Sequence, residues 1–264
     1  MLTIESSCVL DGVELRQPAT GQMREIFRGH EISGWEQSVM ISIEGEGDLQ
    51  VSYCDLQPGK DRIAVSHNGR SLTIDNTLFR CPVGGGVLWH GRDQSTVSIS
   101  NAEIHSAVGI WARESDSTLS LENVTWIGDQ PAGAQSQFLR IREAEGPNDG
   151  RLQVDLKQCL VVGDILVSFR SLLPRSGLAS LTDSFQLTET ENVYAVQTYL
   201  QNRRRREKTL SGWRRLIDSS DSTSVAANIA VGDEQKIDRD AIKWGNEDRV
   251  STFGAPATLG PAAR

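Results

Sequence analysis

The sequence lacks both an excess of positive charge and any long hydrophobic run. Its 264 residues include 35 Asp and Glu against 27 Lys and Arg, which gives a formal net charge of −8. A general nucleic-acid-binding protein usually carries a basic excess, so we expect no nucleic-acid partner. No stretch approaches the roughly 20 apolar residues that a membrane-spanning helix needs, so we expect no membrane segment.

Signals for export and for metal binding are also missing. Residues 1–8 have neither the basic start nor the apolar core of a secretory signal. The chain as given is therefore expected to be cytoplasmic, with the compartment unknown if it is a fragment of a longer protein. The sequence has only 4 cysteines and no CxxC spacing, so no metal site is predicted and no cofactor is expected. Cys54 and Cys159 are interpreted as small buried thiols.

The motifs of several enzyme classes are absent as well. The chain has no Gly-rich GxGxxG, His-Arg-Asp or Asp-Phe-Gly of a protein kinase. Hydrolysis of a polysaccharide would need two or three carboxylates at a controlled separation. The acidic residues of the repeat described below are scattered between columns; they are Asp75, Glu103, Glu122 and Asp155. No catalytic residue is assigned.

What the sequence does have is an internal repeat. The phrase Ser71–Phe79 returns at 96–104 and 118–126, with weaker copies at 49–56, 153–161 and 178–186. Such a period is typical of a solenoid, and apolar residues that alternate within each copy indicate β-strands. The copies align at intervals of 23, 25, 22, 35 and 25 residues on Val51, Ile74, Ile99, Leu121, Leu156 and Leu181.

Three further columns follow the aligned apolar residue in each copy. Two positions later stand residues that suit a sharp corner, because Asn and Asp tolerate left-handed backbone; they are Tyr53, Asn76, Asn101, Asn123, Gln158 and Asp183. The next position is small, and then an apolar wall resumes at Leu56, Phe79, Ile104, Trp126, Val161 and Gln186. These columns together predict an all-β fold, a single-stranded right-handed parallel β-helix of about seven coils.

The chain is expected to divide into three parts. Residues 1–191 form the parallel β-helix, with a second strand in each coil at 62–65, 87–89, 110–112, 138–141 and 165–169. Residues 192–217 include a capping helix, predicted over Tyr199–Ile217, that buries Trp213 against the C-terminal end. Residues 218–264 are a polar linker and an extended, partly disordered, irregular tail. At the other end the strands start without a cap, so either residues 16–40 fold over that end or the natural chain has more coils upstream. The abrupt start favours a truncated unit, and an open strand edge would allow copies to associate.

A resemblance rests on the repeat, on the stretch Cys159–Gly163, and on Thr209-Leu-x-x-Trp213 followed by the Ser-rich stretch 218–224. Residues 40–217 resemble the right-handed, pectate lyase-like β-helix region of certain bacterial multidomain proteins. In planctomycete-type proteins that region often follows a serine/threonine kinase domain. The resemblance implies the fold, and it implies that any kinase activity belongs to an upstream domain.

The best candidate for a ligand surface lies on the second strands. If Val87, Trp89, Ile110 and Ala112 point inward, the alternating residues point outward on adjacent coils; these are Leu88, His90, Trp111 and Arg113, with Arg140 and Arg142 on the next coil. A Trp flanked by Arg and His suits a sugar ring or an anionic glycan. The alternative is that the segment 128–137 folds over Trp111 and buries it. The basic run Arg203–Arg206 is a second candidate, for an acidic partner, or else a solvated helix face.

Three functions remain open from the sequence. The leading hypothesis is a non-catalytic β-helix binding or scaffolding module for a glycan or protein partner, once part of a larger signalling protein. The alternative is a carbohydrate-active enzyme, a lyase or hydrolase, in which some of the four acidic residues converge with Arg113 or Arg142. The third is a structural remnant without a ligand.

Overall fold

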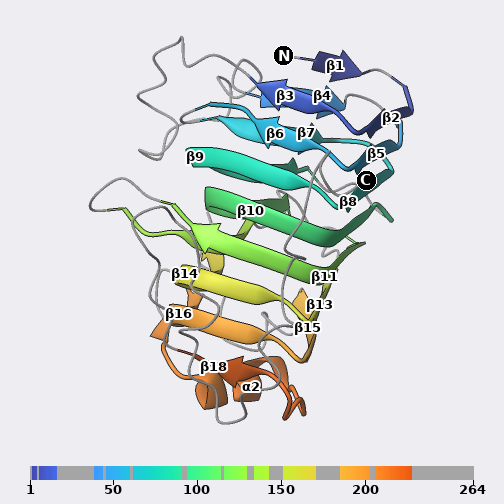
Figure 1. The fold of residues 1–264 in the computed structure, drawn as a ribbon. Coiled ribbons are helices and arrows are strands. Elements are labelled where there is room, and N and C mark those ends of the chain that lie inside the picture. Colours follow the sequence, from blue (N-terminus) through green and yellow to red (C-terminus); the bar gives the residue numbers. More distant parts are fainter. Residues whose placement is uncertain are drawn as a thin grey trace.

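The computed structural model describes residues 2–4, 6–16, 39–43, 46–59, 62–90, 94–113, 116–129, 134–142, 151–170, 185–202 and 206–227. Over these residues the protein is all-β, with a single 18-stranded sheet and one short helix (Figure 1). The strands are β1 (Leu2–Ile4), β2 (Cys8–Asp11), β3 (Glu14–Arg16), β4 (Val39–Ile43), β5 (Leu49–Ser52), β6 (Asp55–Gln57), β7 (Ile63–His67), β8 (Ser71–Asp75), β9 (Leu78–Trp89), β10 (Thr96–Arg113), β11 (Ser117–Gly128), β12 (Gln137–Arg142), β13 (Leu152–Lys157), β14 (Leu160–Arg170), β15 (Phe185–Thr190), β16 (Val193–Gln201), β17 (Arg206–Glu207) and β18 (Val225–Ala226). The helix is α2 (Leu210–Ile217).

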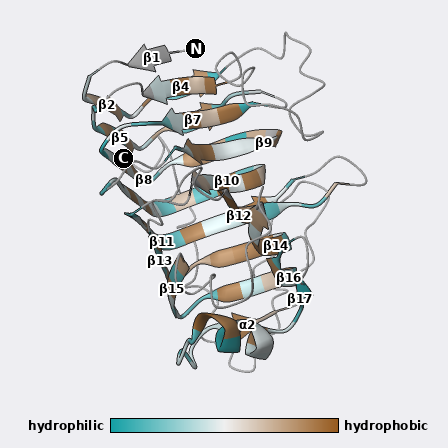
Figure 2. Cartoon of the chain, turned by 180° about the vertical axis from the view of Figure 1, so that it is seen from behind, coloured by the Kyte–Doolittle hydropathy of each residue, from teal (hydrophilic) through white to brown (hydrophobic). Residues whose placement is uncertain are grey.

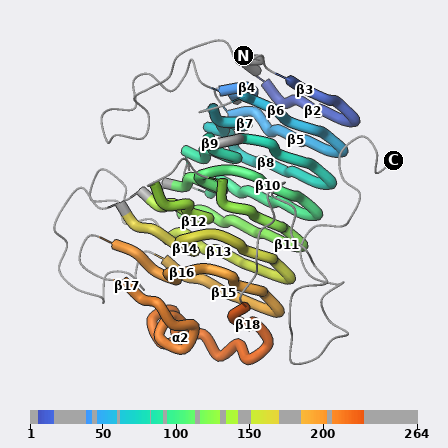
Figure 3. The backbone as a smooth tube through the Cα atoms, turned by 60° about the vertical axis from the view of Figure 1, so that its left-hand side comes forward, coloured from blue at the N-terminus to red at the C-terminus, as the bar shows by residue number. Residues whose placement is uncertain are grey.

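Nearly every strand pairs in parallel with a strand one repeat further along the chain. The long strand β10 shows the arrangement, because its three parts belong to three different stacks. Residues 96–100 pair with β8 and β11, residues 103–106 pair with β9 and β11, and residues 108–113 pair with β9 and β12. The chain therefore bends twice within one strand, and its successive turns lie above one another (Figure 3).

The first bend lies at the predicted corner column. A positive φ of 47–54° is found at Tyr53, Asn76, Asn101, Asn123, Gln158 and Glu191. In the N-terminal turn Gly12 takes the same place, with φ 66°. Some of the side chains bond along the stack, since Asn101 Nδ2 donates to Asp75 Oδ1 at 3.0 Å and Asn123 Nδ2 to Asn101 Oδ1 at 3.4 Å. The prediction of left-handed corners is confirmed at all five described positions, and Asp183 lies outside the described residues.

The second bend lies between Ser106 and Val108, and the glycine that follows it, Gly109, has no room for a side chain. A Cβ on Gly109 would lie 2.7 Å from the carbonyl oxygen of Phe138 and 3.1 Å from the Trp126 ring. Trp126 fills this inner corner, where its Nε1 donates to Ser106 Oγ at 3.1 Å. The small residue at 109 thus lets the β10 backbone pass close to the core aromatics.

In the core, the aligned residues of successive copies of the repeat pair with one another and form continuous columns. Val51, Ile74, Ile99, Leu121 and Leu156 pair in that order, as predicted, and all are 0–2% exposed. The wall column continues likewise from Leu56 through Phe79, Ile104 and Trp126 to Val161. Figure 2 shows the hydrophobic residues concentrated in the strands of the stack. Within a column, each side chain packs on the equivalent side chain of the preceding turn. In this way one hydrophobic core extends through all turns.

The sixth copy of the repeat was placed wrongly. Leu156 pairs with Glu189, and Gln153 rather than Val161 pairs with Gln186. The next turn therefore starts at β15, and Tyr194 takes the wall position next to Val161. Residues 178–183 and Ser184 lie outside the described residues. The alternating apolar residues in the sequence 178–186 match the pattern of the repeat. The copy that pairs with Leu156, however, has Glu189 at the aligned position.

The C-terminal end is closed by α2, although the helix is shorter than predicted. Residues 193–201 form β16, where Tyr199 and Leu200 are core residues, and Arg206–Glu207 form β17. The helix prediction is wrong over these residues, because hydrophobic residues near a basic run match a helical face as well as a strand. Trp213 is fully buried, as predicted for the cap. Thr209 is the N-cap, with its Oγ1 accepting from the Gly212 N–H at 3.1 Å.

Candidate functional site

The predicted ligand surface falls on the third stack, where the ends of β9, β10, β12, β14 and β16 lie side by side. Its outer positions form one row in exact register order, namely Leu88, Trp111, Arg140, Ser168 and Gln201. The inner positions expected between them are confirmed, since Val87, Trp89, Ile110 and Ala112 are all 0–1% exposed. Residues from five separate parts of the sequence are therefore neighbours on one face.

Trp111 and Arg140 form the centre of this outer row. The Arg140 guanidinium carbon lies 4.1 Å from the centroid of the Trp111 ring, a cation–π contact. Trp111 is half-buried and packs on a small cluster of Val39, Ile63 and Leu88 that is separate from the main core. One face of the indole is thus covered by a charged group, so it does not offer that face for stacking on a sugar ring.

Leu88 does not behave as predicted. It was expected to be an exposed contact residue, yet it is buried, with 9% exposure. The reason is the outer cluster itself, because Val39 of β4 and Ile63 of β7 cover Leu88 from the preceding turns. Leu88 supports Trp111 from beneath and is not a ligand contact.

His90 lies at the edge of the same surface, directly after β9. Its Nε2 is 3.2 Å from Ser66 Oγ, and its backbone N–H donates to the His67 carbonyl at 3.0 Å. The imidazole is therefore part of a local hydrogen-bonded turn between two neighbouring layers. The other outer-face histidine, His105, pairs with Glu103 at 2.5 Å on the second stack.

Two residues further along, arginines occupy paired backbone positions at the ends of three of these strands. Arg113 pairs with Arg142, and Arg142 pairs with Arg170. These positions alternate with the buried Ala112, Ile141 and Phe169. Arg170 was missed in the sequence, although it ends its strand just as Arg113 and Arg142 end theirs.

Arg206 lies on the C-terminal side of these strand ends. It is exposed on β17, which pairs in antiparallel fashion with the end of β16. Its Nε donates to Gln201 Oε1 at 3.1 Å, and its guanidinium also reaches Gln135 Oε1 at 3.3 Å. Arg206 was assigned to a helical basic run from the sequence, but it lies on a strand, and residues 203–205 lie outside the described residues.

The four acidic residues considered for an enzyme do not converge with these arginines. Asp75 accepts from Ser100 and Asn101 at the first corner, at 2.6 and 3.0 Å. Glu122 is bound by Lys157 at 2.6 Å on the first stack, and that carboxylate raises the pKa of Lys157. Glu103 belongs to the second stack, and Asp155 is exposed on the first. Within the described ranges they occupy other faces than the row around Trp111.

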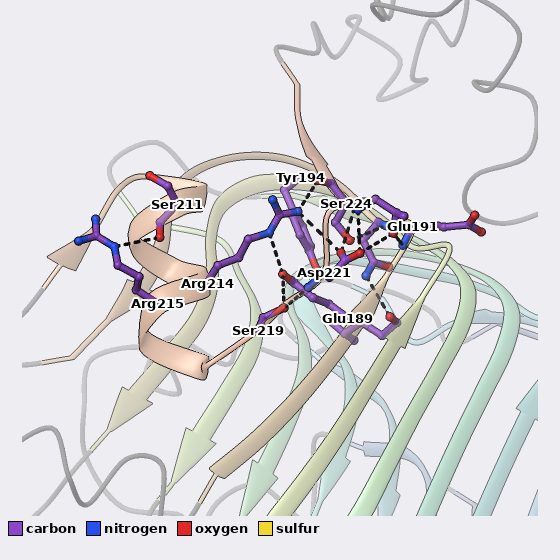
Figure 4. Close-up of polar contacts among 12 residues, drawn as sticks. Glu189, Glu191, Tyr194, Ser211, Arg214, Arg215, Ser219, Asp221 and Ser224 are labelled. Carbon is purple, nitrogen blue, oxygen red and sulfur yellow. Dashed lines mark hydrogen bonds and ion pairs between the residues drawn. The ribbon is translucent and has the colours of Figure 1, made fainter.

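A separate polar cluster, drawn in Figure 4, lies where α2 meets the last turn. Glu189 takes the aligned core position and its side chain is fully buried. It accepts from Tyr194 Oη at 2.9 Å and lies 3.3 Å from Arg214 Nε. Arg214 also donates to the Ser224 carbonyl at 2.5 Å and lies 3.7 Å from Asp221. The contacts join α2, β15 and the segment before β18, so the cluster fastens the cap.

The cluster perturbs its titratable groups. Burial, reinforced by the Glu189 carboxylate, raises the pKa of Tyr194 well above its ordinary value and that of Tyr199 to about 12. Burial opposes ionisation of Asp221 too, but hydrogen bonds from Ser224 and Thr223 outweigh it and lower the pKa of that carboxyl. Every charged group named here has a partner within the cluster, which is the pattern of a structural network.

Neither the thiols nor the other donors form a metal site within the described part of the chain. No three His, Cys, Asp or Glu side chains gather there as metal ligands would. Cys54, Cys81 and Cys159 are buried and Cys8 is partly exposed, all four as free thiols. Burial raises the pKa of Cys54 and Cys81, and that of Cys159 to about 12. The two corner cysteines are therefore small buried residues, as predicted.

Comparison with known proteins adds no relative. No protein-family model matches the chain, and no curated protein or solved structure shows significant similarity to it. Among the described residues, no helix is long and apolar enough to cross a membrane.

Proposed function

We propose that the stacked turns are a right-handed parallel β-helix, with the pectate lyase-like arrangement that the repeat resembles. The support is the pairing pattern. The strands form three parallel stacks joined at bends, one of them a left-handed corner, and equivalent positions of successive turns pair with one another. A solenoid of this kind presents long outer rows, and such rows are the binding surfaces that repeat proteins use.

The function proposed for it is that of a non-catalytic binding or scaffolding module. The observation that carries the proposal is the outer row around Trp111, where Arg140 lies 4.1 Å from the centroid of the Trp111 ring. Trp and Arg, which meet here as Trp111 and Arg140, are residue types enriched at binding hot spots. They stand on strands whose inner faces are packed in the core, so the surface is rigid before a ligand arrives.

A carbohydrate-active enzyme is the second candidate, and the geometry gives it less support. Glycoside hydrolysis needs two carboxyl groups about 5–10 Å apart around one bond. Asp75, Glu122 and Glu103 instead have partners on different corners and stacks. The row around Trp111 contributes Arg140 and no carboxylate, which suits the holding of a ligand more than proton transfer.

A glycan array probed with the wild-type protein and with Trp111→Ala tests the module. The variant must first keep the wild-type circular dichroism spectrum, because Trp111 also covers the outer cluster of Val39, Ile63 and Leu88. Binding that is lost in Trp111→Ala supports a ligand site on this face. Binding that survives the substitution contradicts the placement, and turnover of a bound glycan that depends on Glu103 or Glu122 contradicts the non-catalytic assignment.

A further inference from the structure

The second stack carries buried side chains on its outer face. In its wall column Trp126, Val161 and Tyr194 point into the core, so the residues on either side of each point outward. On β11, β14 and β16 these outward residues are nearly inaccessible, with exposures of 0–4%; they are Thr125, Ile127, Leu160, Val162 and Val193. Outward side chains buried to this degree are covered by another part of the protein.

The strands of the stack do not supply this cover. Outward side chains of neighbouring strands stand side by side about 4.8 Å apart, so they shield one another's flanks and not their tips. Leu160, Val162 and Val193 form a hydrophobic cluster of their own. The described hydrophobic residues that pack against it are Ala195, Val225 and Ala227, which belong to the same face or extend it beyond β16. The cover is therefore a further segment of the chain.

The order of the strands limits which segment this is. Residues 143–150 and 171–184 lead from the third stack to the first, so both of their ends lie away from the second stack. Residues 130–133 span at most about 14 Å when fully extended, too little to cross three strands and return. Residues 17–38 begin after β3, which lies five strand intervals from β14, or about 24 Å.

The segment 228–264, in contrast, starts at the cluster itself. β18 lies at the C-terminal end of the stacked turns (Figure 3), where Val225 pairs with Val193. The Ala227 N–H donates to the Tyr194 carbonyl at 2.8 Å, and the Ala227 side chain packs on the cluster. We propose that the outer face of the second stack is a docking surface within the molecule, and that its occupant is the chain's own segment 228–264.

The residue types of this segment fit the face in order. Residues 228–231 read Asn-Ile-Ala-Val and continue the apolar character of β18, whereas residues 233–249 contain 6 Asp and Glu and 4 Lys and Arg. The face changes in the same direction. It is apolar next to β18, and it carries the ion pairs Arg80–Asp55 and His105–Glu103 on the N-terminal turns. Docking closes this face to other ligands and leaves the row around Trp111 as a separate surface.

The first test is photo-crosslinking in the full chain. Val162 is replaced by an aliphatic amino acid with a photoreactive diazirine, and the cross-linked peptides are identified by mass spectrometry. The control places the same group at Thr73, an exposed outward position of the first stack. Circular dichroism and the melting temperature establish that both proteins are folded.

We expect cross-links from position 162 to peptides of 228–264 within one molecule, and none to that segment from position 73. Cross-links from 162 to any other segment, such as 17–38, would overturn the proposal. So would cross-links between two copies, or none at all. Neither outcome depends on a ligand at Trp111, so failure here leaves the binding module untouched.

A second test compares Val162→Ser with Val9→Ser in limited trypsin digestion. Val9 also points outward from a strand, but it is 63% exposed. We expect cleavage after Lys236, Arg239 and Lys243 to be about tenfold faster in Val162→Ser than in the wild type. Loss of the buried Val side chain raises the fraction of undocked segment by about that factor. Val9→Ser should be cleaved at the wild-type rate, and equal rates in the two variants would contradict the docking.

Discussion

At the scale of single residues, the most informative side chain is Glu189. It stands at the end of an apolar column that runs from Val51 to Leu156, and its carboxylate is fully buried. A buried charge is tolerated when it is paired and hydrogen-bonded, and here Arg214 and Tyr194 supply the partners. The polar end of the column marks where the stacked core stops and the cap begins.

The first prediction concerns Arg214. Replacing Arg214 by Ala should lower the free energy of unfolding by about 3 kcal/mol, because it leaves the buried Glu189 carboxylate without its counter-charge. Urea denaturation measures the effect. Arg215→Ala, an exposed position on the same helix, is the control and should change stability by less than about 0.5 kcal/mol. Equal effects of the two substitutions would show that Glu189 does not depend on Arg214.

The second prediction is a pH dependence that originates at Asp221. Its pKa in the folded protein is lowered from the ordinary 3.8, since the hydrogen bonds from Ser224 and Thr223 outweigh burial. The folded state therefore holds this proton less tightly than the unfolded chain does. The resulting stabilisation is complete above the unfolded pKa and disappears as pH falls through the folded pKa.

Asp221→Asn removes that contribution. We expect the variant to be less stable than the wild type at pH 6, with the difference shrinking below about pH 4 as the wild-type carboxyl becomes protonated. Unfolding free energies measured between pH 2.5 and 7 (about one value per half unit) test it. A stability difference that stays constant over this range would mean that the Asp221 charge is not responsible.

At the scale of elements, the corners decide where each strand ends. Non-glycine residues with φ near 50° recur at one position per turn, and Asn fits that region better than branched residues do. Asn123 is a clean position to test, because its side-chain amide makes only a long contact of 3.4 Å to Asn101 Oδ1 among the described residues. What the corner requires of residue 123 is then its positive φ and not a bond of its side chain.

We therefore predict that Asn123→Val costs about 1–2 kcal/mol of stability, since a β-branched side chain is strained at positive φ. Asn123→Gly, which removes the side chain but accepts the same backbone, should stay within about 0.5 kcal/mol of the wild type. Thermal and urea unfolding of the two variants give the comparison. A glycine variant as unstable as the valine variant would show that the amide, and not the backbone conformation, matters.

Much of this element structure was predictable from the sequence. The repeat between Leu49 and Val161 was aligned correctly, because each turn carries both its apolar alternation and a corner residue. The last turn was not aligned correctly, because Glu189 interrupts the apolar column. Its ion pair with Arg214 cannot be recognised from the sequence. The helix was extended over β16 for a related reason: the periodicity of Tyr199 and Leu200 does not distinguish a strand from a helix, and only the neighbouring strand β14 decides it.

The candidate site was predictable in the same uneven way. Strand alternation and the repeat length were enough to place Trp111 next to Arg140, and the register agrees. The burial of Leu88 was not foreseen, because the residues that cover it, Val39 and Ile63, come from earlier turns. Nor was the contact of Arg140 with the ring face, which depends on side-chain conformation.

At the scale of the whole molecule, the account depends on one geometric property, the register between successive turns. Register puts Leu156 on Leu121 in the core, and it also puts Arg140 beside Trp111 on the outer row. A slip of one residue would turn every outward side chain inward. The fold and the proposed binding face therefore stand or fall together.

The most direct test of that register is a disulfide between turns. Ser120 of β11 and Asp155 of β13 are paired positions on the first stack, 35 residues apart in sequence. Parallel neighbours about 4.8 Å apart are within the Cα separation that a disulfide bridges. We predict that Ser120→Cys/Asp155→Cys, in a background without the native cysteines, oxidises readily to an intramolecular disulfide in the folded protein. The shifted pair Ser120→Cys/Gln153→Cys should not. Efficient closure of the shifted pair, or no closure of the aligned one, would contradict the stacked-turn architecture and the surface built on it.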